Sequence, residues 1–520
     1  MLKKRLPERL TPAAAKHGLR PLYGDIHNHC ALSYGHGSLQ DALRRARRQL
    51  DFVSVTGHAH WPDMPVDDPR VAHIVAFHVE GFAKLKKAWP SHFATLSACD
   101  EPGSFTVFPG YEIHSCAHGD YTIVYRDLAP HDTVLKDSPA ELRKALEAAL
   151  PGHAFAFPHH IGYRRGARGI NWDSFDPGLS PVVEMISMHG CAETSLTDRP
   201  YLHSMGPSDG RSTMRYGLRQ GHVFGVVGNS DHHSAYPGSY GHGRMAVYAR
   251  ENSRDAIWDA ILQRRTNALT GDCAHLFITL AGVAQGGIVR PCDDAELAIE
   301  AVGGGFIDAI DVVRNGDIAA RITPSLSPSP IGGGGLQLET ILVLELGWGE
   351  RNSEHCWTGR VGLSGGRLLA VEPRFRGREV VSPLEAEAED ADAADIECGD
   401  DEVRFRLVAS ANPNNRTPTT QAIALHVSLA PEARIEAQID GETFTTSVDR
   451  LLDGALSGNI GAIDSPAYRF HPLPQPHEWQ WQGRVPLGAI SDGESVYVRM
   501  RQANGQWAWS SPIFCRSIRQ

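Results

Sequence analysis

Histidine and carboxylate side chains recur at the ends of short apolar runs in the first half of the chain. The first such group is Asp25-Ile26-His27-Asn28-His29, in which two imidazoles stand two residues apart. On an extended backbone, residues at this spacing point to the same side. Two neutral imidazoles on one face suit Zn²⁺, Mn²⁺ or Fe²⁺. The pair alone is a weak signal, because HxH arises by chance and a histidine at a strand end often only makes a hydrogen bond.

The same pattern returns along the next two hundred residues. The further candidates are His36, His58, Glu112, His159, His160, Asp231 and His233. If the preceding strands are neighbours, their tips meet and supply imidazoles for cations and carboxylates that bridge them. The alternative, in which each of these residues is independently a surface or core residue, becomes hard to hold for all of them. The recurrence therefore predicts a shared metal site.

Residues 20 to 265 alternate short apolar runs with amphipathic stretches. The apolar runs are 22–26, 52–55, 105–108, 154–157, 182–186 and 224–227, and the amphipathic stretches are 39–50, 79–89, 138–150, 212–221 and 253–265. Three of these stretches open with Ser, a favourable N-cap. Such alternation favours a parallel sheet, and in a closed barrel the functional residues gather at the C-terminal strand ends. Residues 121–125 look like an extra strand without a helix, so we expect a distorted barrel.

After about residue 270 the chain consists of short β-type runs broken by Gly and Pro, which predicts a β-rich, sandwich-like domain. We therefore divide the chain into an N-terminal arm at 1–19, a barrel at 20–270 and a β-rich domain at 271–520. The acidic stretch 384–402 and the glycine-rich segment near residue 330 are expected to be loops. Six tryptophans of this half are expected in its core or at the domain interface rather than in a sugar-binding platform: Trp348, Trp357, Trp479, Trp481, Trp507 and Trp509.

Composition narrows the class of protein. A chain of 520 residues with 42% hydrophobic content is long enough for two or three domains. It has no apolar run of signal-peptide or membrane-spanning type. Its nine cysteines lack a CxxC pair, which favours a reducing, cytoplasmic setting. The net charge of −11 argues against nucleic acid as a partner. The sequence is compatible with a homo-oligomer.

The ordered combination DIHNH with the trailing His36, TGHAH, PGYEIHS, FPHHIGY and GNSDHH resembles the PHP superfamily, named for polymerase and histidinol phosphatase. The resemblance covers residues 20 to about 270. It implies a distorted barrel of seven strands that holds two or three divalent metal ions and hydrolyses phosphate esters. The segments RRTNALTGDC and RQANGQWAWSSPIF resemble an uncharacterised PHP subfamily with a β-rich C-terminal extension, for which no substrate is established.

The resemblance also implies a ligand set. One metal would be held by His27, His29, Glu112 and Asp231, a second by His36, His58 and His233, and a third by Glu112, His118 and His159. His160 competes with His159, while His189 and Cys191 are reserve ligands and Glu184 is a buried support. One departure is Gly57, where the family usually carries Asp. Without this carboxylate the orientation of His58 loosens, unless His60 compensates.

The expected chemistry is hydrolysis by a metal-bridging hydroxide. Metals ~3.5–4 Å apart lower the pKa of a shared water towards ~7, so no Ser or Cys nucleophile is needed. Protonation of the leaving group needs an acid near the metals, and the candidates are His60, His160 and His232. Three arginines after a ligand strand, Arg164, Arg165 and Arg168, are candidates to hold a phosphate or carboxylate. The alternative for them is a solvated basic loop.

Three functions follow in order of preference. The first is a phosphoesterase acting on a small or medium organic phosphate, a small anionic molecule. The second keeps the metals and hydrolyses a carboxylic ester, lactone or amide with the same hydroxide. The third is a non-catalytic, metal-stabilised protein whose β-domain binds glycan or protein. The first half contains no GxSxG, Walker or GxGxxG motif, which disfavours serine catalysis, nucleotide handling and hydride transfer.

Overall fold

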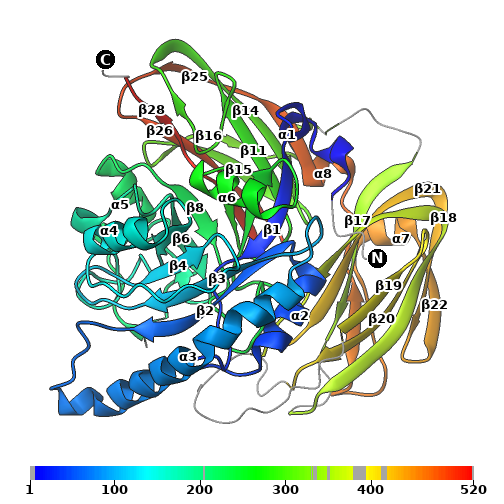
Figure 1. The fold of residues 1–520 in the computed structure, drawn as a ribbon. Coiled ribbons are helices and arrows are strands. Elements are labelled where there is room, and N and C mark those ends of the chain that lie inside the picture. The colour runs from blue at the N-terminus through cyan, green and yellow to red at the C-terminus, as the bar shows by residue number, and fades with distance from the viewer. Residues whose placement is uncertain are drawn as a thin grey trace.

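The computed structural model describes residues 6–202, 205–329, 331, 337–347, 352–378, 394–411 and 418–517. Strands outnumber helices throughout, and the β-rich character expected of the second half is confirmed. In Figure 1 the blue to green half, which contains α2 to α6, lies beside the yellow and orange sheet of β18, β21 and β22. The helices are α1 (Pro12–Lys16), α2 (Leu39–Gln49), α3 (Ala72–Cys99), α4 (Pro139–Ala149), α5 (Met214–Arg219), α6 (Arg254–Leu262), α7 (Val448–Asp453) and α8 (Pro476–Trp479).

The first three predicted strands form the parallel start of one sheet. They are β1 (Arg20–Asp25), β2 (Phe52–His60) and β3 (Thr106–Ile113), joined by α2 and α3. Because the strands are parallel, their carboxyl ends lie at the same edge. The register places His58 directly opposite Glu112. This edge carries the first residues of the candidate site.

The parallel order ends after β3. The remaining strands of the first half are β4 (Tyr121–Tyr125), β5 (Ala154–Pro158), β6 (Val182–Ser187), β7 (Gly190–Cys191), β8 (Gly225–Gly228), β9 (Arg244–Ala249) and β10 (Thr266–Leu269). The extra strand β4 is confirmed and runs antiparallel to both β3 and β5. On the other side of β1, β9 is antiparallel to both β1 and β10. An antiparallel neighbour needs no crossover helix, which explains the missing one between β3 and β4.

A closed seven-stranded barrel is not shown by this pairing. β6 and β8 pair in parallel in a separate three-stranded sheet with β7. Among the described strands, no backbone pairing joins β5 to β6 or β8 to β9, although these strands lie next to each other. The strands therefore surround the candidate site without a continuous hydrogen-bonded wall.

Three serines are predicted from the sequence as helix N-caps, and the structure confirms two of them. Ser138 and Ser253 are confirmed as caps of α4 and α6, because each side chain accepts a hydrogen bond from the backbone three residues on. The prediction for Ser212 is wrong by one residue. Thr213 caps α5 instead, accepting from the backbone nitrogen of Tyr216. Both side chains suit a cap, so residue type alone did not distinguish them.

The second half extends the sheet of the first. One 13-stranded sheet contains β1 to β5, β9 and β10 and continues through β27, which pairs antiparallel with β10. Its C-terminal strands are β13 (Ile288–Val289), β15 (Ile307–Arg314), β16 (Asp317–Ile322), β26 (Ser495–Gln502), β27 (Trp507–Ser510) and β28 (Ile513–Cys515). The division of the chain near residue 270 stays a prediction, since this sheet runs through both parts.

Two further sheets complete the second half. The four-stranded sheet comprises β11 (His275–Leu280), β12 (Val283–Ala284), β14 (Cys292–Val302) and β25 (Gln480–Ile490). It shares one hydrophobic core with the end of the 13-stranded sheet, where Ile278 and Leu297 pack with Ile310 and Val498. The eight-stranded sheet comprises β17 (Leu338–Leu346), β18 (His355–Arg374), β19 (Ala394–Cys398), β20 (Glu402–Ala409), β21 (Gln421–Ile439), β22 (Glu442–Ser447), β23 (Leu456–Asn459) and β24 (Ala467–Phe470).

The expectations for individual C-terminal segments have mixed outcomes. Trp357, Trp479, Trp481 and Trp509 are buried, as expected of core or interface residues, and Trp507 stacks on Trp509. Trp348, most of the glycine-rich segment near 330, and residues 384–393 of the acidic stretch lie outside the described residues.

The expected loop at 384–402 is wrong for its second part, because β19 pairs with β20 there. In β19 half-buried Ala, Ile and Cys alternate with exposed Asp and Glu, the period of a strand.

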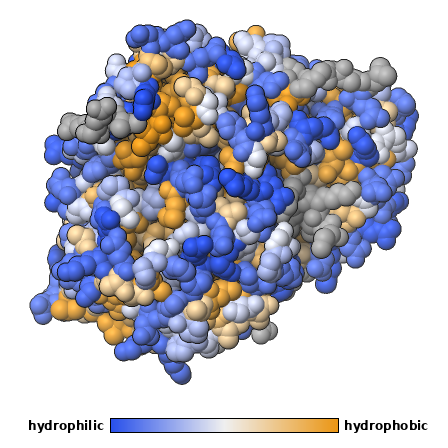
Figure 2. Space-filling view, turned by 45° about the horizontal axis from the view of Figure 1, so that its top comes forward, coloured by the Kyte–Doolittle hydropathy of each residue, from blue (hydrophilic) through white to orange (hydrophobic). Residues whose placement is uncertain are grey.

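The surface is mixed in character. On the face shown in Figure 2, hydrophobic residues lie in separate groups among mainly hydrophilic ones. No helix of the described chain combines the length and the apolar composition needed to cross a membrane.

A buried ion-pair network joins the two halves. Glu193, which follows β7 and is 4% exposed, lies 2.7 Å from Arg215 and 2.9 Å from Arg499. Its carboxylate also accepts hydrogen bonds from the Tyr497 hydroxyl at 2.6 Å and the Trp509 indole at 2.9 Å. The C-terminal strands β26 and β27 are thereby fixed to the loop that follows β7.

We expect Glu193→Ala to lower the free energy of unfolding by about 3–5 kcal/mol, since it leaves Arg215 without its carboxylate and Arg499 with Asp311 as its remaining acidic partner among the described residues. Urea denaturation followed by tryptophan fluorescence measures this change. The control is Glu296→Ala, which breaks an exposed pair with Arg484 and should cost less than about 1 kcal/mol. Equal effects of the two substitutions would contradict the interpretation.

Candidate metal centre

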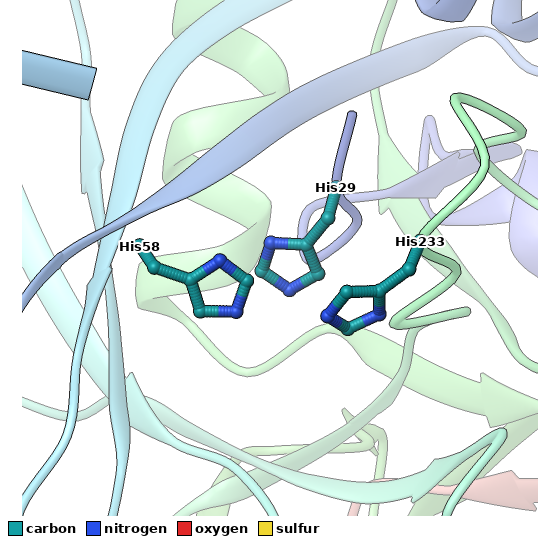
Figure 3. A group of neighbouring side chains, drawn as sticks. All are labelled: His29, His58 and His233. Carbon is teal, nitrogen blue, oxygen red and sulfur yellow. The ribbon is translucent and has the colours of Figure 1, made fainter. Parts of the chain in front are cut away.

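Imidazoles and carboxylates from six segments of the first half meet in one buried region. Five groups have possible ligand atoms that all lie within 4.8 Å of one another: His29-His58-His233, His27-His29-Glu112, His58-Glu112-His114, Glu112-Asp120-His159-His160 and His160-His189-Asp231. Figure 3 shows the first group, in which imidazoles from three separate segments converge. The groups share members, so they form one continuous cluster.

Glu112 lies at the middle of this cluster. Its side chain is 1% exposed. Oε2 faces three Nε2 atoms at 3.3, 3.2 and 3.6 Å, those of His27, His29 and His58. Oε1 lies 3.1 Å from Nε2 of His159 and 3.3 Å from Nδ1 of His114. A carboxylate with imidazoles at both oxygens has the arrangement needed to bridge two cations.

Asp231 is the second buried carboxylate. Oδ1 lies 3.0 Å from Nε2 of His29 and 3.4 Å from Nε2 of His27. Oδ2 lies 2.9 Å from Nε2 of His189 and 3.6 Å from Nε2 of His160. Both Asp231 and His160 have positive φ, at 50° and 51°. This conformation is disfavoured for such residues and persists where the surroundings fix it.

Two further buried acids hold the cluster in place. Asp25 accepts hydrogen bonds from the Ser230 hydroxyl at 2.5 Å and from the backbone nitrogens of Gly238 and His27 at 2.7 and 3.1 Å. It thus fixes the loop after β8 to the end of β1. Burial raises the pKa of Asp25 to about 6, although these donors lower it. Glu184 lies 2.8 Å from Nδ1 of His27, as expected of a buried support.

His58 is oriented by a hydroxyl group and an aromatic ring. Its Nδ1 lies 3.0 Å from the Ser33 hydroxyl, and its ring stacks on Tyr34 at a centroid distance of 3.6 Å. A Cβ at Gly57 would approach Leu85 to 2.7 Å, so a larger residue there would have to displace a core side chain. Ser33 and Tyr34 therefore fix the orientation of His58.

Not all predicted ligands join these groups. His36 and His118 belong to none of them within the described chain. The backbone nitrogen of His36 donates to His233, and His118 Nδ1 lies 2.9 Å from the Ser174 hydroxyl. The sequence interpretation omitted His114 and Asp120, which do join. His114 was detectable, because it stands two residues after Glu112 and so shares its side of the chain.

The three predicted proton donors occupy different places. His160 lies among the ligand groups, 4% exposed. His60 is half-buried at the end of β2. The His232 ring lies 5.3 Å from the ring of His242, and a Cβ built at Gly377 would approach it to 2.5 Å. His232 therefore faces the C-terminal half.

The three predicted arginines also differ. Arg164 and Arg165 are exposed, and Arg165 pairs with Asp173 at 2.6 Å. Arg168 is only 18% exposed, and its guanidinium lies 3.4 Å from Oδ2 of Asp120, which also lies 3.1 Å from Nδ1 of His114. Of the three, Arg168 alone is held beside the cluster.

The pKa shifts of the carboxylates and of three imidazoles suit cation binding. Burial alone would lower the pKa of His27 and of His29, but the carboxylates beside them raise it. Burial alone would raise the pKa of Glu112, but the neighbouring His159, His58 and His114 hold it well below its usual range. His27 and His189 do the same for Asp231. Burial lowers the pKa of His58 and His160 well below 6.5 and that of His233 to about 3. Ionised carboxylates and neutral imidazoles are the forms that ligate metals.

The donor set fits divalent transition metals. Nitrogen ligands from histidine together with carboxylate oxygens suit Zn²⁺, Fe²⁺ or Mn²⁺. His29 Nδ1 and His160 Nδ1 are buried and make no hydrogen bond within the described chain. His29 and His160 both belong to the groups that could hold a metal ion. Taken together, these groups offer enough ligands for more than one cation.

Comparison with known proteins gives distant matches. No family model matches the chain. An uncharacterised protein of Chlamydia trachomatis is 25% identical over 173 residues, which are 30% of this chain and 28% of that protein. An uncharacterised protein of Chlamydia pneumoniae is 22% identical over 255 residues, which are 45% of this chain and 41% of that protein. The matches thus span less than half of these relatives.

Two solved structures are similar over part of the chain. One is a two-domain protein from Bacteroides vulgatus containing a predicted PHP-like metal-dependent phosphoesterase, with 18% identity and a TM-score of 0.32 over 59% of this chain and 86% of that one. The other is PsfC from Pseudomonas syringae, with 16% identity and a TM-score of 0.28 over 44% of this chain and 82% of that one.

We expect purified protein to contain more than one transition-metal equivalent per chain, measured by elemental analysis. His114→Ala should lower the metal content, because its Nδ1 lies 3.3 Å from Glu112 and a lost ligand weakens binding at least about tenfold. His118→Ala is the matched control and should leave the content unchanged. If His118→Ala lowered the metal content and His114→Ala did not, the result would favour the ligand set implied by the family resemblance over the one implied by the geometry.

Proposed function

We propose that the protein is a metal-dependent hydrolase of the PHP type, most specifically a phosphoesterase. The observation that carries this proposal is the placement of Glu112 and Asp231, each 1% exposed and each facing imidazoles with both oxygens. The proposed ligands are His27, His29, His58, Glu112, His159, Asp231 and His233, with His114, His160 and His189 completing the set. Divalent cations bound there would lower the pKa of a shared water towards ~7 and so supply a hydroxide nucleophile.

Arg168 favours a phosphate substrate. Its guanidinium is largely buried beside the cluster and is held by Asp120. A guanidinium matches the paired oxygens of a phosphate and neutralises part of its charge. A neutral carboxylic ester, lactone or amide gains less from such a group. The proposed role of Arg168 is therefore to bind and orient the phosphoryl group, while Arg164 and Arg165 remain on the surface.

Proton transfer to the leaving group is assigned to His60. His160 lies among the proposed ligands and His232 faces the other way, which leaves His60 near the same strand end as His58. Burial lowers the pKa of His60. A bound phosphate would favour its protonated form, because an opposite charge nearby stabilises the cation.

We expect the protein to hydrolyse p-nitrophenyl phosphate or bis(p-nitrophenyl) phosphate faster than p-nitrophenyl acetate, with loss of turnover in chelator. His29→Ala and Asp231→Ala should each lower kcat at least about 100-fold, because each removes a group that positions the reacting atoms. His153→Ala, which changes a peripheral pair with Asp127, is the control. Acetate turnover alone would support the ester hydrolase, and tight metal binding without turnover would support the binding protein. Full activity in both ligand variants would refute the proposal.

We expect Arg168→Met to lower kcat/KM for the phosphate ester by about 10- to 100-fold, the range of a charged hydrogen bond. The change should appear mainly in KM if the arginine binds ground and transition states equally. Arg165→Met is the matched control, because that arginine pairs with the exposed Asp173. Equal losses in the two variants would remove the assigned role of Arg168.

A further inference from the structure

Aromatic side chains from three segments gather beside the metal cluster. Tyr34 comes from the loop after β1, Trp61 directly follows β2, and Phe77 and Phe82 belong to the first half of α3. Figure 1 shows α3 running alongside β2 and extending past its end. The first half of this helix therefore lies near the strand ends that carry the candidate ligands.

His78 of α3 connects these rings into one group. It is 4% exposed, and its ring centroid lies 5.1 Å from that of Tyr34, 5.0 Å from Trp61 and 6.0 Å from Phe82. The Phe77 ring lies 4.4 Å from that of Tyr34. Rings at such distances attract one another through their edges and faces. We call the five residues together the aromatic wall: Tyr34, Trp61, Phe77, His78 and Phe82.

The aromatic wall is continuous with the candidate ligands. Tyr34 stacks on His58 at a centroid distance of 3.6 Å, and its hydroxyl lies 3.3 Å from Nε2 of His114. The His114 ring lies 5.5 Å from that of Trp61. Both imidazoles also face the Glu112 carboxylate. The wall thus begins where the cations are proposed to bind and continues over the first half of α3.

The wall lies outside the hydrophobic cores of the molecule. None of its members belongs to a core cluster of the described chain. Trp61, Phe77 and Phe82 are only half-buried. Large apolar rings normally fill a core, and apolar side chains that gather outside one often mark a binding site. Core packing therefore does not account for these rings, and a ligand would cover them.

The metal cluster reaches solvent beside the wall. The side chains of His233 and Arg168 are 19% and 18% exposed. The Tyr34 ring lies 6.1 Å from the ring of His233, and Asp120 joins Arg168 to His114 by contacts of 3.4 and 3.1 Å. A substrate that enters from this side would meet the guanidinium, the proposed cations and the wall together.

We infer that the substrate is a phosphate ester whose alcohol part carries an aromatic ring, and that the aromatic wall binds this ring. The inference rests on the proposed phosphoesterase activity and names its substrate class. The phosphoryl group lies with Arg168, and the ring packs against Trp61 and Phe77. Hydrolysis breaks the bond between phosphorus and the alcohol oxygen. Water supplies the hydroxide that joins phosphorus and the proton that leaves on the aromatic alcohol.

The first test compares 2-phenylethyl phosphate with ethyl phosphate, whose alcohols are similar in acidity. We expect kcat/KM to be at least about tenfold higher for the phenyl ester, the gain from burying a ring of this size. 2-Cyclohexylethyl phosphate should be at least about twofold poorer than the phenyl ester, because a saturated ring lacks the attraction between aromatic rings. Equal values for the phenyl and ethyl esters, or for the phenyl and cyclohexyl esters, would overturn the inference.

Variants locate the ring of the substrate. Trp61→Leu with Phe77→Leu should lower the ratio of kcat/KM for the phenyl ester to that for the ethyl ester below about threefold, since leucine removes both rings. This ratio does not respond to a general loss of folded or metal-loaded protein. The matched control is Trp507→Leu with Phe306→Leu, a half-buried pair of the C-terminal half. In both pairs the tryptophan indole donates to an aspartate. The control should keep the ratio within about twofold, because distant sites act independently. An unchanged ratio in the first pair would overturn the inference, and the comparison of esters with the native protein decides it even where a variant does not fold.

Titration calorimetry gives a readout without turnover. 2-Phenylethylphosphonate and ethylphosphonate resist hydrolysis, because a carbon atom replaces the ester oxygen. The purified protein with its metals should bind the phenyl compound at least about tenfold more tightly, and equal affinities would overturn the inference. If no phosphate ester is hydrolysed, the hydrolase proposal fails, while this titration still shows whether the wall binds an aromatic ring. If phosphate esters are hydrolysed at rates that do not depend on the ring, the hydrolase proposal stands and this inference fails.

Discussion

Two ionised carboxylates at the centre of the first half impose the main constraint on this structure. Glu112 and Asp231 are each 1% exposed. An isolated charge is strongly unfavourable away from water, so each carboxylate requires compensating groups on every side. The imidazoles around them supply this compensation, and the metals that we propose would complete it. The surrounding fold has to bring those imidazoles to one place.

The strand ends and one anchored loop meet that requirement. The parallel strands β1, β2 and β3 place His58 and Glu112 opposite each other. Asp231 comes from the loop after β8, which is fixed to β1 by the hydrogen bonds of Asp25. The positive φ values of Asp231 and His160 show that local backbone preference is overruled at this point. Such conformations persist where tertiary contacts determine them.

Period-two spacing and recurrence selected residues that the structure brings together, while their role as ligands stays a prediction. His27, His29, His58, Glu112, His159, Asp231 and His233, each expected from a strand-end motif, all belong to the groups that converge. His118 was expected as a ligand only from the family resemblance, and His114 was not proposed at all. His118 lies in the irregular segment after β3, where side-chain direction depends on the turn and not on a fixed period.

The order of the sheet was less predictable than the existence of its strands. Apolar runs indicate strands, but they do not specify the partner. The strands β9 and β10 were not among the predicted runs, and they lie antiparallel to their neighbours. The pairing of β10 with β27 joins residues about 240 positions apart, and no local pattern encodes such a contact. The cap at Thr213 shows the same limit on a smaller scale, since Ser212 is an equally suitable residue type.

The loop between β8 and β9 connects the candidate metal centre with the C-terminal half. It carries Asp231 and His233 near its start and Tyr240, whose ring lies 5.7 Å from the Arg374 guanidinium, near its end. Between them His232 faces His242 and Gly377, and the Tyr240 hydroxyl donates to Asp272 at 2.7 Å. If one of these residues shifted, its neighbours would have to shift too, because a dense interior leaves little free space. The C-terminal half is therefore part of the framework that positions Asp231.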